Sequence, residues 1–134
     1  MVAETGWHLV SVAVAVVEGP AEEAAVMPTL MAINPVIAER ADDFEDLLRT
    51  IVVPAVREYR PELEERWEVL RATEEEDGTV IFTFILRGGD ASDWRLEPLL
   101  DQALGPERAH RVISIMSGMM KREQYGWIMA PVQL

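Results

Sequence analysis

Asn34 is the residue whose position most strongly suggests chemistry. It lies within residues 29–37, TLMAINPVI, an apolar run typical of a strand, where asparagine is disfavoured. A buried amide has to be hydrogen-bonded, so Asn34 could fix a substrate oxygen or a dioxygen-derived species. The alternative is that Asn34 and Pro35 only end or bulge the strand.

His110 and Tyr125 are the candidates for moving a proton during a reaction. A neutral imidazole can act as a general base or bind iron. Because His110 lies beside Arg108 and Arg111, a surface histidine is the alternative. The other histidine, His8, precedes the main domain, and we expect it to have no role.

Three aromatic residues could form the wall of a binding pocket. Tyr125 and Trp127 alternate onto one face of the closing strand, and Trp67 lies in an earlier strand. Pockets for planar ligands are mostly apolar and carry a few oriented polar groups, of which Arg71 could be one. The alternatives are that the rings fill the core and that Arg71 and Arg87 pair with acidic side chains.

Composition and charge exclude several classes of function. The net charge of −12 repels a phosphate backbone, so we expect no nucleic-acid partner. The absence of cysteine excludes a disulfide framework, a thiolate zinc site and a cysteine nucleophile. The acidic runs at residues 42–46, 62–68 and 74–77 have no histidine nearby, so we interpret them as solvated surface and expect no metal. The sequence motifs of hydrolases, kinases and dehydrogenases do not occur.

The sequence gives no reason to expect a membrane protein or a secreted one. No apolar run approaches the ~20 residues that span a bilayer. Residues 9–17, LVSVAVAVV, have the character of a signal-peptide core, but no Lys or Arg precedes them and Glu4 carries the wrong charge. We therefore expect a cytoplasmic protein.

The elements that must position these side chains alternate between strands and helices. An N-terminal extension, residues 1–26, contains a strand-like segment at 9–17, and the main domain covers residues 27–134. Within this domain the patterns predict strands at 29–37, 63–73, 79–87 and 124–132, with a polar hairpin turn at 74–78. They predict helices at 42–59, 94–104 and 107–120. Pro54 should bend or break the first helix near Val53.

The order β-α-β-β-α-β predicts a ferredoxin-like α+β fold with a four-stranded antiparallel sheet and both helical segments on one face. The predicted strands do not alternate cleanly with polar residues, so the other face of the sheet should also be apolar. A large exposed apolar face implies an association surface. We therefore expect a homodimer that forms through the sheet.

Several segments together resemble the antibiotic biosynthesis monooxygenase-like group. These are Met27-Pro28 followed by LMAINPVI, the helical segment DFEDLLRTIVVPAVRE, the hairpin with an acidic turn, and the aromatic closing strand. The likeness covers roughly residues 27–131 and implies a dimeric α+β barrel. Members of this group include cofactor-independent oxygenases that act on polycyclic aromatics, haem-degrading enzymes, polyketide cyclases and proteins without known catalysis.

The haem-degrading branch of this group carries an asparagine on its first strand, then a tryptophan and an axial histidine on its second helix. Asn34 and His110 match the asparagine and the histidine. The place of the tryptophan falls near Asp101, and Trp94 lies sixteen residues before His110. The resemblance thus implies a protein without a cofactor, with haem as the alternative.

The leading hypothesis is a small-molecule enzyme of secondary metabolism, either a cofactor-free oxygenase or a cyclase, acting on an apolar aromatic or polyketide-like substrate. Asn34, His110 and Tyr125 would be catalytic, and Trp67, Arg71 and Trp127 would bind the substrate. The alternatives are a non-catalytic dimeric module for ligand binding or assembly, and a haem-degrading monooxygenase. An open cavity lined by Asn34 and aromatic rings would favour the enzyme, and a filled interior would favour the module.

Overall fold

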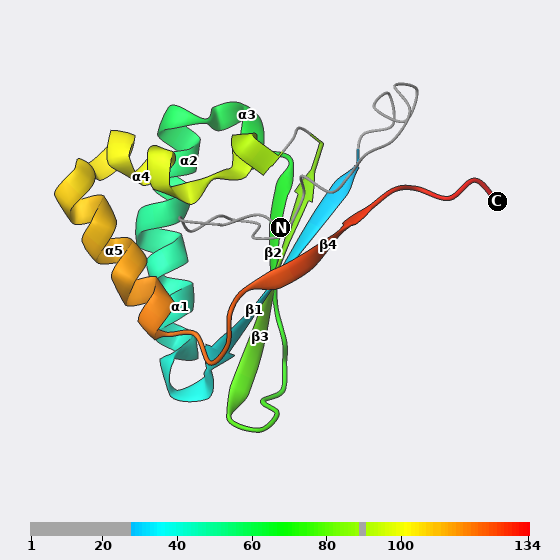
Figure 1. The fold of residues 1–134 in the computed structure, drawn as a ribbon, viewed down its shortest axis with the longest axis horizontal. Helices are drawn as coiled ribbons and strands as arrows, with labels where there is room; N and C mark the ends of the chain where they lie inside the picture. Colours follow the sequence, from blue (N-terminus) through cyan, green and yellow to red (C-terminus); the bar gives the residue numbers. More distant parts are fainter. Residues whose placement is uncertain (1–27, 89–90) are drawn as a thin grey trace.

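A computed structural model of the chain describes residues 28–88 and 91–134, and its centre is a four-stranded antiparallel sheet (Figure 1). The strands are β1 (Thr29–Ile37), β2 (Trp67–Arg71), β3 (Thr79–Arg87) and β4 (Tyr125–Met129), in the spatial order β2-β3-β1-β4. This order and the helices on one side of the sheet agree with the predicted ferredoxin-like fold. The predicted strand at residues 9–17 and the predicted boundary at residue 26 lie outside the described residues.

Five α-helices and three shorter turns connect the strands within the described ranges. The connection from β1 to β2 consists of the 3₁₀ turn η3 (Ala38–Arg40), α1 (Ala41–Leu47), the π turn η4 (Leu48–Val52), α2 (Val53–Tyr59) and α3 (Pro61–Glu64). Between β3 and β4 lie the 3₁₀ turn η5 (Ala91–Trp94), α4 (Leu96–Leu104) and α5 (Pro106–Gly118). Figure 1 shows these helices gathered on one side of the sheet, with the C-terminal segment running away from them.

The first helical segment changes its hydrogen-bond pattern where Pro54 was expected to interrupt it. In a regular α-helix the ring of Pro54 would crowd the carbonyl of Thr50. The chain instead forms the π turn η4, whose last bond runs from the N–H of Val53 to the carbonyl of Leu48. The hydroxyl of Thr50 donates to the carbonyl of Asp46 over 2.8 Å. The helix then continues as α2, so the predicted interruption near Val53 is a local widening of the helix.

The predicted strand at 63–73 is wrong at its start. Pro61 ends α2 and also occupies the first turn of α3, a position that suits its fixed φ angle and missing N–H. Leu63, two residues later, is buried in the core. Residues 63 and 64 are therefore helical, and pairing with β3 begins only at Trp67.

The hairpin between β2 and β3 closes with a two-residue turn. Asp77 and Gly78 both have positive φ angles, 54° and 70°, which is the backbone of the type I′ turns that aspartate and glycine favour. Glu76 and Thr79 exchange backbone hydrogen bonds of 2.9 and 3.0 Å across this turn. The predicted hairpin turn at 74–78 is confirmed.

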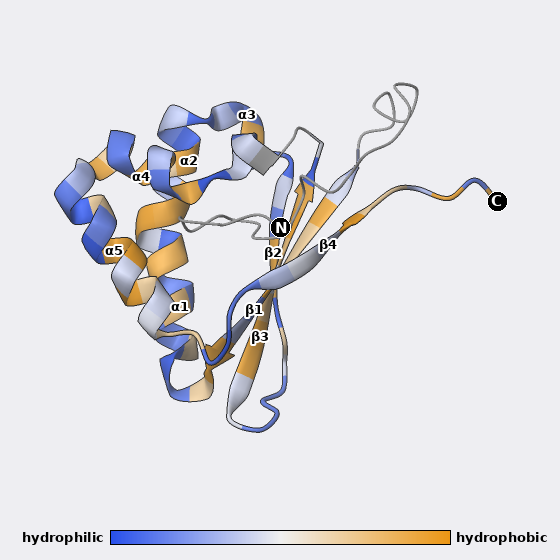
Figure 2. Ribbon diagram, viewed as in Figure 1, coloured by the Kyte–Doolittle hydropathy of each residue, from blue (hydrophilic) through white to orange (hydrophobic). Residues whose placement is uncertain are grey.

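The main core lies between the sheet and the helices. Alternate residues of β1 and β3 point to this side and are almost fully buried, among them Leu30, Ala32, Val36, Phe82, Phe84 and Leu86. The helices contribute side chains such as Phe44, Leu100 and Met116. Figure 2 shows β1 and β3 as predominantly hydrophobic and the β2–β3 hairpin loop as hydrophilic. Within the described ranges, no helix is long and apolar enough to cross a bilayer.

Candidate functional site

Asn34 lies on the helix-facing side of β1 and is completely buried, with 0% of its surface exposed. Its amide nitrogen donates to the carbonyl of Phe82 over 3.2 Å and, more weakly, to the carbonyl of Ala32 over 3.4 Å. Its amide oxygen accepts a bond of 2.7 Å from the side-chain amide of Gln124. The polar atoms of Asn34 are thus satisfied by the protein itself.

An interruption in the edge strand explains why β1 carries an asparagine at this position. The chain after α5 pairs with the end of β1 through the N–H of Ile37 and the carbonyl of Met119, 2.8 Å apart, and through the N–H of Lys121 and the carbonyl of Pro35, 2.7 Å apart. Regular pairing resumes only between Tyr125 and Ile33. Asn34 lies between these two stretches, and its bond to Gln124 bridges the gap.

Gln124 is the residue of this network that the sequence reasoning missed. It precedes β4 and shares the phase of Gly126 and Ile128, which oppose the helix-facing residues Ala32 and Leu30 of β1. A polar residue in the helix-facing phase of a closing strand was a signal that could have identified a partner for Asn34.

The residues predicted for catalysis do not lie together. His110 is exposed on α5, whose buried side chains are Ala109, Val112 and Met116. Tyr125 opposes Ile33, and so it lies on the face of the sheet opposite to that of Asn34. Asn34 therefore lies in the core and His110 on the outer surface of the helices. Tyr125 lies on the open face of the sheet, the face that the helices do not cover.

Two of the three residues predicted for substrate binding share the helix-facing side with Asn34. Trp67 opposes Leu86 and contacts Phe84 edge-on, with ring centroids 5.8 Å apart. Arg71 opposes Phe82, and its guanidinium lies 5.4 Å from the centroid of that ring. Trp127, the third residue, lies on the open face.

Arg71 is held by carboxylates of α1. Its guanidinium lies 2.6 Å from Glu45 and 3.0 Å from Asp42, and Glu45 also pairs with Arg49. Hydrogen bonds from Arg71 and then from Arg49 lower the pKa of Glu45, and the bonds to Glu45 and Asp42 raise the pKa of Arg71. The structure therefore agrees with the alternative in which Arg71 pairs with acidic side chains. Arg87 does the same with Glu68, at 3.0 Å.

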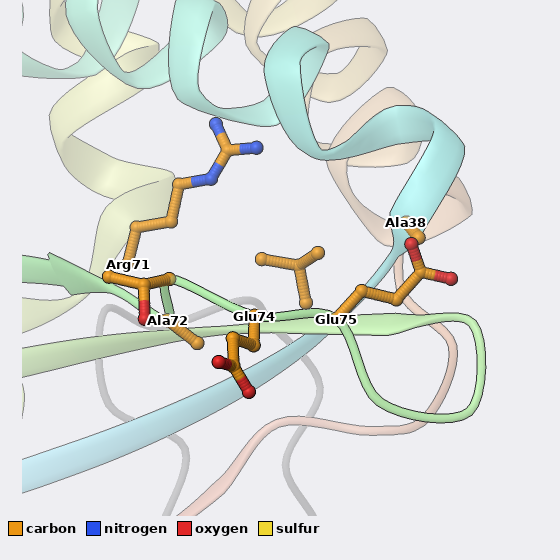
Figure 3. A pocket seen from close by; sticks show the side chains of 7 residues that line it. Ala38, Arg71, Ala72, Glu74 and Glu75 are labelled. Atoms are coloured by element: carbon orange, nitrogen blue, oxygen red, sulfur yellow. The ribbon is translucent and has the colours of Figure 1, made fainter.

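A cleft of about 470 Å³ lies beside this ion cluster. Figure 3 shows Arg71 extending from the end of β2 toward the helices, while Glu75 points toward Ala38. The lining residues are Ala38, Arg71, Ala72, Thr73, Glu74, Glu75 and Val80. A second cleft of about 520 Å³, on the hairpin, is lined by Glu74, Glu75, Glu76 and Asp77 together with Lys121 and Arg122, among others. Neither cleft includes Asn34 or an aromatic side chain. Within the described ranges, no three His, Asp or Glu side chains are placed to hold a metal ion.

The open face of the sheet carries a row of large exposed hydrophobic side chains. Tyr125, Trp127 and Met129 of β4 point to this face, as does Leu70 of β2, and all four are between 43% and 54% exposed. Tyr125 and Trp127 contact each other edge-on, with centroids 5.8 Å apart. Met31, Ile81 and Ile85 on the two central strands lie between these edges. Both edges of this face therefore expose large apolar side chains.

Trp67 carries a buried polar atom in the helix-facing layer. The indole N–H of Trp67 is buried without an acceptor among the described residues. A buried donor that lacks an acceptor costs about 1–3 kcal/mol. Trp67 lines neither of the two clefts.

Comparisons with known proteins give a structural likeness only. No protein-family model matches the chain, and no curated protein matches it. Among solved structures, a putative antibiotic biosynthesis monooxygenase from Caulobacter crescentus is 16% identical, with a TM-score of 0.52, and the match covers 85% of this chain and 100% of that one. A conserved protein from Methanosarcina mazei is 18% identical, with a TM-score of 0.43 over 81% of this chain and 96% of that one. The fold resemblance predicted from the sequence is confirmed: this chain has the ferredoxin-like α+β fold of the Caulobacter protein.

Proposed function

We propose that the protein is a homodimeric module for assembly or ligand binding and that Asn34 has a structural role in it. The observation that carries the structural role is the hydrogen bonding of Asn34, whose amide oxygen accepts from Gln124 and whose amide nitrogen donates to Phe82 and, weakly, to Ala32. Both polar atoms of the Asn34 amide are engaged within the protein, so a substrate would have to compete with these bonds.

Charge supports a second copy of the chain as the occupant of the open sheet face. The chain has a net charge of −12, so two copies repel each other over most of their surfaces. The open face differs, because the charges on its strands are Glu68 and Arg87, which pair with each other. Burying this neutral, apolar face removes several large side chains from water without bringing unpaired acids together.

Sedimentation velocity of substituted proteins tests this proposal. Trp127→Glu places a charge at the centre of the exposed row and should convert a dimer at micromolar concentration into a monomer. Ile115→Glu is the matched control, because Ile115 is 48% exposed on α5, far from the open face in the fold, compared with 54% for Trp127. A dimer that survives Trp127→Glu, or one that Ile115→Glu dissociates, would contradict the proposed surface.

A small-molecule enzyme, an oxygenase or cyclase for an aromatic or polyketide-like substrate, is the second candidate. The unpartnered indole N–H of Trp67 favours it, since it could donate to a substrate oxygen, and the fold is that of a protein named for such chemistry. Trp67→Phe keeps an aromatic ring and removes the donor. If the protein binds a planar quinone in a calorimetric titration, this candidate predicts at least a fivefold weaker affinity for the variant, worth roughly one hydrogen bond.

Haem chemistry does not fit the residues present. The axial ligand implied by the resemblance, His110, is exposed on α5, and the amide of Asn34 is hydrogen-bonded within the core. We therefore derive no step that uses haem.

A further inference from the structure

β2 lies at the edge of the sheet, so only one of its two sides pairs with a described strand. The carbonyl of Arg66 accepts from the N–H of Arg87, and the N–H of Ala72 donates to the carbonyl of Ile81, both over 2.8 Å. Backbone groups alternate in direction along an antiparallel pair, so every second residue of β2 directs its N–H and C=O to the free side. These residues are Trp67, Val69 and Arg71. Such a row of backbone groups is a template for a further strand.

The hydrophobic core is incomplete beside this free side. Trp67 and Val69 point to the helix-facing side and pack against the core, but both are only partly buried. Their neighbours on β3, Leu86 and Phe84, are completely buried at 0% exposure. A further strand beside β2 would cover Trp67 and Val69 and extend the core by one strand.

Residues 9–17, LVSVAVAVV, have the composition and the alternation of such a strand. Valines occupy positions 10, 12, 14 and 16, and serine or alanine occupies positions 11, 13 and 15. Valine is enriched in strands, and successive side chains of a strand point to opposite faces. The four valines therefore suit the helix-facing side, next to Trp67 and Val69. The small residues would add little height to the open face.

The direction of the chain favours the free side of β2 over that of β4. β1 begins at Thr29, at the end of the sheet where β2 begins and β4 ends. A segment that ends there is antiparallel to β2 and parallel to β4, and every other pair in the sheet is antiparallel. A segment antiparallel to β4 would end at the opposite end of the sheet. Residues 18–28 would then have to return along the sheet, and such a crossover usually takes about a dozen residues or more.

The length of the connection is sufficient for the β2 side. Three strand spacings of about 4.8 Å separate β1 from a strand beyond β2, which is about 14 Å in all. Residues 18–28 can span up to about 36 Å when extended. The connection therefore reaches the free side of β2 across one end of the sheet.

We propose that residues 9–17 dock on the free side of β2 as a fifth, antiparallel strand of the same chain. The inference does not depend on the proposed dimer, because it concerns an edge of the sheet and not its open face. Opposed residues of an antiparallel pair present their side chains on the same face. The valines, which face the helices, are then also the residues whose N–H groups bond to β2.

Amide hydrogen exchange of the full chain, measured by NMR, tests this proposal. Val14→Pro removes one of the N–H groups that would bond to β2, and a proline at such a position breaks the ladder. Val26→Pro is the matched control, because the same substitution then lies between the proposed strand and β1. In the wild-type chain the edge amides, those of Trp67, Val69 and Arg71, should exchange at least about tenfold more slowly than in Val14→Pro. The Val26→Pro chain should match the wild type.

Two further readouts keep the test decisive. The amides of Glu68 and Leu70 bond to β3 and should stay protected in all three proteins, which shows that the domain remains folded. In the wild-type chain, nuclear Overhauser contacts should join the amide of Val69 to a residue of the segment 9–17. The absence of such contacts, or equal exchange of the edge amides in the wild type and Val14→Pro, would overturn the proposal.

The same measurements exclude other occupants. If Val14→Pro accelerates exchange in β4 instead of β2, the segment docks on the other edge and the proposal is wrong. If the edge amides lose protection in a monomeric Trp127→Glu chain, the partner chain supplies the strand, and docking within one chain is overturned. Protection that persists in this monomer supports the proposal. A wild-type chain that is itself a monomer would contradict the proposed function but would leave the exchange test of the fifth strand intact.

Discussion

Replacement of Asn34 by alanine separates a structural role from a catalytic one. Asn34→Ala removes the hydrogen bond from Gln124, 2.7 Å long, and the hydrogen bond to the carbonyl of Phe82, 3.2 Å long. The contact with the carbonyl of Ala32, at 3.4 Å, is too long to contribute much. Two bonds at about 1 kcal/mol each, together with partly buried groups left unsatisfied, predict a loss of about 2–4 kcal/mol in the free energy of unfolding.

Urea denaturation followed by far-ultraviolet circular dichroism measures this loss. Gln124→Ala is the matched variant, because it breaks the bond to Asn34 from the other side and should cost at least about 1 kcal/mol. The double variant should show a coupling energy near 1 kcal/mol, because the two residues share one hydrogen bond. If Asn34→Ala costs less than about 1 kcal/mol but abolishes ligand binding or turnover, Asn34 is poised for a ligand and the structural account is wrong.

Other predictions concern the edge strand and the ion cluster. A Cβ atom at Gly126 would lie 1.8 Å from the carbonyl oxygen of Met31, so Gly126→Ala should displace β4. Amide hydrogen exchange measured by NMR should then be faster throughout β4, and unchanged exchange would contradict this prediction. The pKa of Glu45 is lowered, first by Arg71, so its stabilising contribution is present above the ordinary carboxyl pKa and is lost as the pH falls through the lowered one. In an NMR titration Arg71→Ala should raise that pKa, and an unchanged value would show that Arg71 does not hold the carboxylate. Pro54→Ala restores a backbone donor in α2 and should change the free energy of unfolding by less than about 1 kcal/mol, because η4 already avoids the clash between the proline ring and the helix backbone. A larger loss of unfolding free energy in urea denaturation would show that the π turn depends on proline.

The elements predicted best were those whose signals are local. The strands at 29–37 and 79–87 agree with β1 and β3 residue for residue, since both are short, mainly apolar runs that contain several β-branched residues. The hairpin was likewise predicted from a local signal, the acidic turn that ends at Gly78. The start of β2 was missed because Pro61 begins a short helix, and only the burial of Leu63 in the folded core makes that turn worth forming.

The candidate site was harder to predict because it depends on which face of the sheet each strand presents. Period-two alternation places Tyr125 and Trp127 on one face together, and that expectation agrees with the structure. It does not say that Trp67 and Asn34 lie on the other face, since the pairing register between distant strands decides this. The burial of Asn34 could be expected from its place in an apolar strand. Its hydrogen bond to Gln124 could not, because it joins residues 90 positions apart in the sequence.

The mass of the wild-type protein in solution tests the central claim most directly. Sedimentation velocity at micromolar concentration and moderate salt should give a single species of twice the 15.1 kDa chain mass, because the apolar open face has to be removed from water. A single species of 15.1 kDa across that concentration range would contradict the account, because the exposed apolar side chains of β4 and β2 would then remain in contact with water.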